Sequence, residues 1–182
     1  MRVIAGEFGG RQLLAPRGWK VRPTPERVRE ALFSALGDIG GARVADLYCG
    51  TGALGIEAIS RGAADAVLVD QDTRPAMGNV HNLGLLDRIE LVRADACEWV
   101  ASGRTGSPFD LILLDPPYRR LAEIASRLDP HLGALLAPGG RVVVESEAGR
   151  EFELPSLEVV RERRYGRTVV TFHVNPSSPE RE

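Results

Sequence analysis

The stretch RVADLYCGTGALG at residues 43–55 joins an apolar run to a glycine-rich turn and then to the start of a helix. Gly50, Gly52 and Gly55 match the dinucleotide-binding fingerprint G-x-G-x-x-G, which taken alone would indicate NAD. Asp70 follows twenty residues after Gly50, at the end of the next apolar run, where a carboxylate can bind a ribose hydroxyl. This stretch therefore predicts an open α/β sheet with a nucleoside site at its edge.

Apolar runs and helical segments alternate through most of the chain. The runs predict strands at 43–48, 65–70, 88–93, 109–114 and 140–145, and then a hairpin of two strands at 157–164 and 168–174. Between them, helices are expected near 53–61, 73–84, 96–102 and 119–136, the last one broken at Asp129-Pro130. This alternation predicts βαβ units and a mostly parallel sheet covered by helices on both faces.

Residues 1–36 precede this alternation. Two short apolar runs around Gly9-Gly10 predict a β-hairpin within residues 1–15, and a basic loop follows at residues 17–22. A helix is then expected with Thr24 as its N-cap and Pro25 at its first position. We therefore divide the chain into an N-terminal extension (1–36), a cofactor-binding domain (37–174) and a disordered tail (175–182).

Charge is distributed unevenly along the chain. The formal net charge is −2, which by itself argues against a nucleic-acid partner. Residues 1–36, however, hold seven basic against three acidic side chains, and the remaining residues hold 16 basic against 22 acidic ones. Every basic residue except Lys20 is arginine, which suits contacts with phosphate and equally fits an arginine-rich genome. The N-terminal extension is therefore the candidate substrate-facing surface.

Several classes of protein are disfavoured by the 182-residue sequence. No apolar run approaches the roughly 20 residues that span a bilayer, and the first residues lack the apolar core of a signal peptide. Neither cysteine and none of the three histidines has the spacing of a metal site. We expect a cytoplasmic protein with no metal and no membrane partner.

Asp46, near the end of the first strand, argues against NAD. A carboxylate at this position would repel a pyrophosphate but attract an ammonium group. S-adenosylmethionine carries an ammonium and a sulfonium group and no phosphate, so it suits this position better. Asp95, after the third strand, could accept a hydrogen bond from an adenine amine, although an N-cap role in the next helix explains it equally well.

The most specific motif is Asp115-Pro116-Pro117-Tyr118, directly after the most apolar strand. The two prolines remove two amide donors and leave carbonyl groups that can only accept. A planar exocyclic amine could donate its two N–H bonds to the Asp115 carboxylate and the Pro116 carbonyl, which would aim its lone pair at a methyl donor. Tyr118 offers a ring on which a base can stack. The motif therefore predicts an amine methyltransferase.

Three further polar or thiol side chains close to these motifs in the sequence receive no catalytic role. Asn79 and Asn82 fit the polar face of a helix. Cys49, beside the glycine turn, fits the packing of a small side chain.

Taken together, residues 46–55, Asp70, Asp95 and the motif at 115–118 resemble the class I S-adenosylmethionine-dependent amino-methyltransferases. Further stretches are similar to the RsmD family: Ile4-Ala5-Gly6, Gly10-Arg11, Arg22-Pro23-Thr24, residues 27–30, Leu32-Phe33 and residues 57–63. That family methylates the exocyclic N2 amine of one guanine in bacterial 16S ribosomal RNA. The resemblance covers residues 2–174 and implies a Rossmann-like class I methyltransferase fold with a seven-stranded, mostly parallel sheet.

The resemblance also implies roles for individual residues. The catalytic group would be Asp115, Pro116, Pro117 and Tyr118. The S-adenosylmethionine site would comprise Asp46, Tyr48, Gly50, Thr51, Gly52, Leu54, Asp70, Gln71, Asp95 and Ala96. The RNA contacts would comprise Arg11, Arg22, Thr24, Arg27, Arg29 and Arg164. We expect a monomer that acts on 16S rRNA, within an assembling small ribosomal subunit.

Three alternative functions fit part of the pattern. The first is methylation of another planar amine, namely adenine N6, cytosine N4 or a protein glutamine, and the family resemblance opposes it. The second is an NAD-linked dehydrogenase, which Asp46 opposes. The third is a non-catalytic RNA-binding scaffold, which would not need the carboxylate of Asp115.

Overall fold

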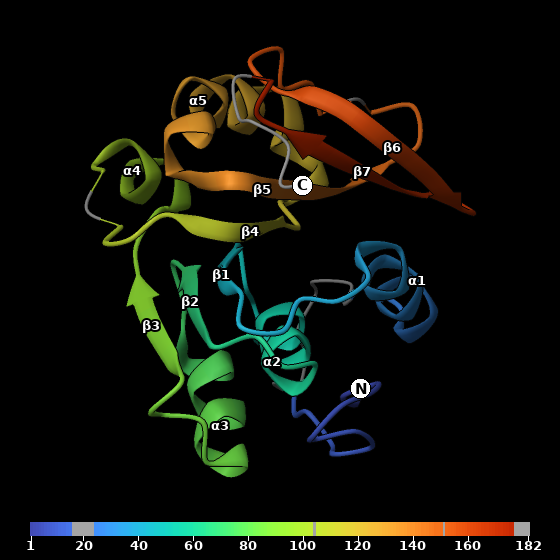
Figure 1. Cartoon of the computed structure of the whole chain (residues 1–182). Coiled ribbons are helices and arrows are strands. Elements are labelled where there is room, and N and C mark those ends of the chain that lie inside the picture. Colours follow the sequence, from blue (N-terminus) through green and yellow to red (C-terminus); the bar gives the residue numbers. More distant parts are fainter. Residues whose placement is uncertain (16–23, 104, 151, 177–182) are drawn as a thin grey trace.

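A seven-stranded sheet in the order β3-β2-β1-β4-β5-β7-β6 forms the centre of the computed structural model, which describes residues 1–15, 24–103, 105–150 and 152–176 (Figure 1). The strands are β1 (Arg43–Leu47), β2 (Asp65–Asp70), β3 (Ile89–Arg93), β4 (Phe109–Leu114), β5 (Leu136–Glu147), β6 (Glu158–Tyr165) and β7 (Thr168–Val174). The first five strands are parallel, and β7 pairs antiparallel with both β5 and β6. The expected seven-stranded, mostly parallel sheet is confirmed.

The sheet separates two hydrophobic cores, because successive side chains on a strand point to opposite faces. In β4, Leu111 and Leu113 belong to one core, whereas Ile112 and Leu114 belong to the other. Helices cover both cores: α1 (Glu26–Leu36), α2 (Ala53–Ser60) and α3 (Arg74–Leu83) cover the first, and α4 (Ala96–Ala101) and α5 (Leu121–Leu135) cover the second. Burial on both faces explains why the central strands are almost continuously apolar.

Near the fifth strand, one expectation is wrong and another is extended. Pro130 lies inside α5 and does not break it. Its side chain is exposed, so water can bond the backbone carbonyl that the missing proline N–H leaves unpaired. The expected strand at 140–145 is longer, because β5 begins directly after α5, with a shift of register between Phe109 and Leu111 of its neighbour.

The N-terminal residues pack against α2. The hairpin expected in residues 1–15 is present in a short form. Its two arms are joined by backbone hydrogen bonds from Val3 N to Arg11 O, from Gly10 N to Val3 O and from Leu13 N to Met1 O, each 2.9 Å long. The buried carboxylate of Glu57 holds this hairpin on α2, because it accepts hydrogen bonds from the backbone N–H groups of Ile4 at 2.7 Å and Ala5 at 3.1 Å.

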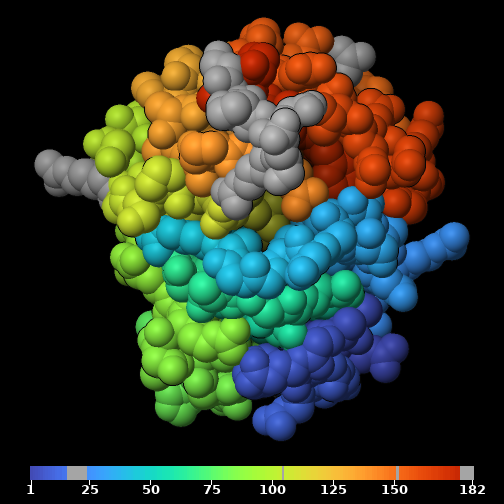
Figure 2. Space-filling view, viewed as in Figure 1, coloured from blue at the N-terminus to red at the C-terminus, as the bar shows by residue number. Residues whose placement is uncertain are grey.

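Asn79 of α3 holds the end of the same segment, and its assignment to a polar helix face is wrong. Its side chain is 1% exposed. Its Oδ1 accepts a hydrogen bond from Leu14 N at 2.8 Å, and its Nδ2 donates to Leu14 O at 3.0 Å and to Thr51 O at 2.9 Å. Figure 2 shows the N-terminal residues (blue) lying against α3 (green). One amide therefore ties the N-terminal segment to the glycine turn.

Some expectations fall outside the described residues. These are the basic loop at 17–22, which includes Arg22, and residues 177–182 of the expected tail. Within the described tail, Asn175 donates a hydrogen bond to Gly133 O at 3.2 Å. Among the helices in the described ranges, none is long and apolar enough to cross a membrane.

Candidate active site

A cavity of about 520 Å³ lies at the carboxyl ends of the central strands, where the strand order reverses between β1 and β4. Most of the expected cofactor and catalytic residues line it: Asp46, Tyr48, Gly50, Thr51, Leu54, Asp70, Gln71, Asp95, Ala96, Asp115, Pro116, Pro117 and Tyr118. Thr24, from the N-terminal extension, lines it as well. The fold therefore gathers residues from four strand ends into one cavity.

The glycine turn shapes one wall of the cavity. Gly50 and Gly52 have φ angles of 54° and 78°, in the left-handed region that favours glycine. Gly50 N donates a hydrogen bond to Asp70 Oδ2 at 2.9 Å, which joins the turn to the end of β2. A Cβ on Gly52 would lie 2.9 Å from the Leu68 side chain. Gly52 therefore allows close packing behind the turn, which explains why it does not line the cavity.

Asp46 is a buried carboxylate at the end of β1, 1% exposed. Its Oδ2 accepts a hydrogen bond from Gly55 N at 2.8 Å, whereas its Oδ1 has no hydrogen-bond partner among the described residues. Burial raises the pKa of Asp46 to about 7, although the Gly55 bond opposes the shift and the charge of Asp70 adds to it. A cationic donor at Oδ1 would satisfy that atom and stabilise the charge. The site therefore fits an ammonium group.

Asp95 has the N-cap role, one of the two roles that the sequence left open, and it also lines the cavity. Its Oδ1 accepts a hydrogen bond from Glu98 N at 3.1 Å, which caps α4. Its Oδ2 accepts another from Gln71 Nε2, also at 3.1 Å, and both residues line the cavity. The cap therefore holds a carboxylate at the end of the cavity where β2 and β3 finish.

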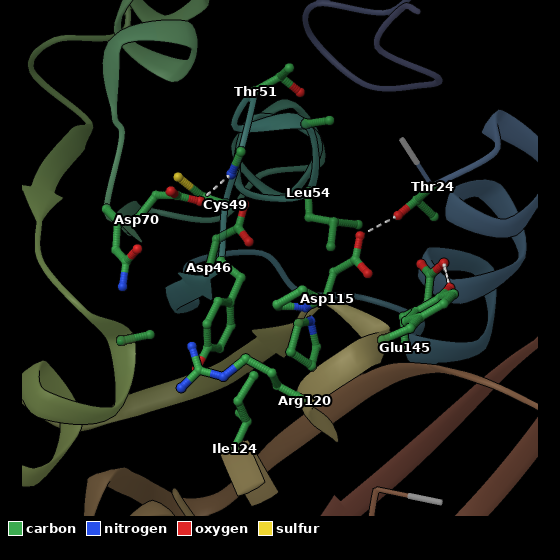
Figure 3. Close-up of a pocket in the computed structure, with 18 of the residues that line it drawn as sticks. Thr24, Asp46, Cys49, Thr51, Leu54, Asp70, Asp115, Arg120, Ile124 and Glu145 are labelled. Atoms are coloured by element: carbon green, nitrogen blue, oxygen red, sulfur yellow. Dashed lines mark hydrogen bonds between the residues drawn. The ribbon is translucent and has the colours of Figure 1, made fainter. Parts of the chain in front are cut away.

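The catalytic candidate Asp115 is bound to the N-terminal extension. Thr24 Oγ1 donates a hydrogen bond to Asp115 Oδ2 at 2.9 Å (Figure 3). The expected N-cap role of Thr24 is wrong, because Pro25 occupies the cap position and no side chain caps α1. Burial, followed by the charge of Glu145, raises the pKa of Asp115 well above its ordinary value, and the Thr24 bond opposes this shift.

Tyr118 is connected to an acid that the sequence analysis missed. Its hydroxyl donates a hydrogen bond to Glu145 Oε1 at 3.2 Å. Glu145 is 3% exposed, lies near the end of β5 and lines the cavity. Like Asp70 and Asp115, it is an acid directly after an apolar run, and that shared position was the available signal.

Four arginines, here called the rim arginines, also line the cavity: Arg119, Arg120, Arg127 and Arg167. Three of them form salt bridges with acids. Arg120 pairs with Glu123, and Arg167 pairs with Glu147. The third pair joins Arg127 Nη2 to Asp95 Oδ1 at 3.5 Å. Arg119 is exposed and forms no salt bridge in the described part of the chain. Arg119 and Arg120 directly follow the motif at 115–118, which could have identified them.

Of the expected RNA contacts in the described residues, Thr24 lines the cavity and the arginines do not. Arg29 is fully buried, so its expected contact with RNA is wrong. Its guanidinium donates instead to Arg2 O and, at 3.4 Å, to Met1 Sδ, because this side of α1 packs under the N-terminal residues. Arg11, Arg27 and Arg164 are exposed but do not line the cavity.

Comparisons with known proteins identify the family. The family model described as Conserved hypothetical protein 95 matches residues 1–174. Ribosomal RNA small subunit methyltransferase D of Escherichia coli K12 is 37% identical over 162 residues, which cover 86% of this chain and 79% of that protein.

Solved structures share the fold. A hypothetical protein of Thermus thermophilus is 30% identical and superposes with a TM-score of 0.81, covering 96% of this chain and 99% of its own. An RNA methyltransferase from Salinibacter ruber, solved in complex with S-adenosyl-L-homocysteine, is 23% identical with a TM-score of 0.68, covering 88% and 98% of the two chains. The chain therefore belongs to the RsmD family, that of ribosomal RNA small subunit methyltransferase D, and has the class I methyltransferase fold.

Proposed function

We propose that this chain transfers a methyl group from S-adenosylmethionine to the exocyclic N2 amine of one guanine in 16S rRNA. Membership of the RsmD family supports the coarser statement, methylation of ribosomal RNA. One observation supports the finer proposal: Asp115 and Pro116 line the same cavity as Asp46, whose Oδ1 has no hydrogen-bond partner among the described residues. Acceptors for an amine and a binding site for a cation thus share one cavity.

S-adenosylmethionine is the cofactor, and when bound it supplies an electrophilic methyl group. Asp46 would accept the ammonium group at Oδ1. Asp70 would accept ribose hydroxyls, and its hydrogen bond from Gly50 keeps the ribose site and the glycine turn together. Asp95 and Gln71 would bind the adenine end, where their side chains are already hydrogen-bonded to each other.

The motif at 115–118 would orient the target amine. The carboxylate of Asp115 and the carbonyl of Pro116 accept its two N–H bonds, which holds the nitrogen lone pair toward the methyl donor. The nitrogen gains a methyl group and loses one proton, which Asp115 or water accepts. The half-buried ring of Tyr118 supports the base by stacking, with its hydroxyl fixed on Glu145.

The substrate in this proposal is 16S rRNA within an assembling small subunit, and the enzyme acts as a monomer in the cytoplasm. The N-terminal extension at 1–36 would face the RNA through Arg11 and Arg27, which are exposed. Residues 1–36 hold only four more basic than acidic side chains, and the whole chain has a net charge of −2, so affinity for free RNA is expected to be modest. Recognition would then also require the shape of the ribosomal particle.

The test uses small subunits from cells that lack this protein. The purified chain is incubated with these particles and with S-adenosylmethionine labelled in its methyl group, and the modified nucleoside is mapped by mass spectrometry. We expect the label in N2-methylguanosine at one position of 16S rRNA. Label in N6-methyladenosine or N4-methylcytidine would overturn the guanine assignment alone. No transfer to particles or to naked rRNA, with wild-type particles as the already methylated control, would overturn the function.

A further inference from the structure

We propose that Thr24 is a positioning residue of the methyl transfer, whose hydroxyl holds the Asp115 carboxylate ready to accept the target amine. The inference rests on the proposed function, in which Asp115 is that acceptor. It gives the N-terminal extension a part in the chemistry, in addition to its proposed contact with RNA.

The hydroxyl of Thr24 is built into the cavity wall. Thr24 is 8% exposed, and its hydrogen bond to Asp115 spans 91 positions of the sequence. The start of α1 does not require this hydroxyl, because Pro25 O accepts from Val28 N at 2.9 Å and from Arg29 N at 3.1 Å. The threonine side chain is therefore directed to the carboxylate and not to its own helix, as Figure 3 shows.

Asp115 lies in surroundings that disfavour its negative charge. Burial, the charge of Glu145 and the charge of Asp46 all raise the pKa of Asp115, and the hydrogen bond from Thr24 is the interaction that lowers it. A protonated carboxyl would lose accepting capacity toward the amine, because one oxygen would then carry a proton. The hydrogen bond from Thr24 also occupies Oδ2 of Asp115, which leaves Oδ1 of Asp115 for the substrate amine. Thr24 thus favours both the charge and the orientation that transfer requires.

The element that carries Thr24 is firmly attached to the rest of the fold. Leu32 and Phe33 of α1 are buried in the core shared with α2, at 2% and 1% exposed. The carboxylate of Glu57 and the amide of Asn79 hold the preceding residues to the same scaffold. A side chain on such a support can fix its partner more closely than one on an unattached loop.

The experiment compares Thr24→Val, which keeps the shape and removes the hydroxyl, with Thr24→Ser, which keeps the hydroxyl. Rates are measured on under-methylated small subunits between pH 5.5 and 9. For Thr24→Val we expect kcat to fall about 10- to 100-fold at pH 7, the range for a hydrogen bond to a charged group, with both KM values within about twofold. The acidic limb of its pH profile should move to higher pH, because Asp115 then ionises less readily. Thr24→Ser should behave like the wild type.

Two controls keep the result decisive. Thermal unfolding and S-adenosylhomocysteine binding identify a variant that has simply lost its fold. If Thr24→Val unfolds, Thr24→Ser and Thr24→Ala are compared instead. Adding Thr24→Val to Asp115→Asn should produce almost no further loss, since that amide cannot ionise. An unchanged acidic limb, or equal losses in Thr24→Val and Thr24→Ser, would overturn the inference and leave the function intact. An inactive wild type would instead overturn the function.

Discussion

The N-terminal extension and the rim arginines both carry positive charge, but they use it differently. In the extension, Arg2 pairs with Glu26, Arg29 is buried against backbone, and the exposed Arg11 and Arg27 do not line the cavity. Along the cavity, three rim arginines pair with acids, and Arg119 is exposed beside the motif at 115–118 without a salt bridge among the described residues. A basic run in a sequence therefore gives the number of charges but not which of them reach the site.

Asp115→Asn should have the largest effect on activity. The change keeps the shape of the side chain but weakens the acceptor for the amine, so kcat should fall about 10²- to 10³-fold. Affinities for S-adenosylhomocysteine and for the particle should stay within about twofold, measured by calorimetry and filter binding. Glu30→Gln, a matched change from carboxylate to amide at an exposed position of α1, is the control and should retain the wild-type rate. If the control lost its activity and Asp115→Asn kept it, the methyl transfer would not depend on the motif at 115–118.

Arg29→Ala should affect stability and not RNA binding. Its removal leaves the partners of a buried guanidinium unsatisfied, so the free energy of unfolding in urea should fall by about 3 kcal/mol. The exposed neighbour Arg27→Ala should change it by less than about 0.5 kcal/mol. If Arg29→Ala weakens RNA binding and leaves the unfolding free energy unchanged, the structural role assigned to Arg29 is wrong.

Cofactor affinity should depend on pH through Asp46. Its pKa is about 7 in the free protein, and a bound ammonium group favours the ionised form, so the affinity decreases as the pH falls through 7. Below that value the decrease should approach about tenfold per pH unit, measured by calorimetry with S-adenosylhomocysteine from pH 8.5 to 5.5. Asp46→Asn should bind weakly with a flat profile. An equal slope in both proteins would assign the dependence to another group.

Arg119→Gln tests the rim directly, with a smaller effect. It should weaken binding to small-subunit RNA by a few-fold at moderate salt and lower the slope of log affinity against log salt by about 0.7 to 0.9. Arg27→Gln is the matched change in the extension. A larger change in slope for Arg27 than for Arg119 would reverse the comparison, whereas similar changes would indicate that the RNA spans both regions.

Local pattern and short-range spacing allowed most of the fold to be predicted. The alternation of apolar runs and helices gave the parallel strands, because their burial on both faces leaves a clear sequence signal. The edges of the sheet were harder, since the start of β5 at Leu136 depends on pairing with Phe109 and not on its own residues. The hairpin in residues 1–15 was predicted from its local pattern, but its attachment to α2 was not, because Glu57 is distant in the sequence.

The candidate site likewise contains residues that the local sequence pattern predicts and residues whose roles depend on distant contacts. Asp46, Asp70 and Asp115 could be found because each lies at, or directly after, the carboxyl end of an apolar strand. The roles of Thr24 and Asn79 could not be found, because each depends on a partner on another element. A threonine before a helix has a good local explanation as a cap, and only the tertiary structure shows that its hydroxyl binds a carboxylate instead.

The Asn79 bridge also constrains the order in which the molecule can assemble. The amide joins residues 65 positions apart, and the Thr24–Asp115 contact joins residues 91 positions apart. A chain emerging from the ribosome therefore makes its N-terminal extension first but must wait for α3, and then for the end of β4, before that extension has its partners. Closing loops of this length slows folding more than it weakens the native state. Methyl transfer would then begin only after the distant parts have met, so a half-made enzyme could not modify RNA.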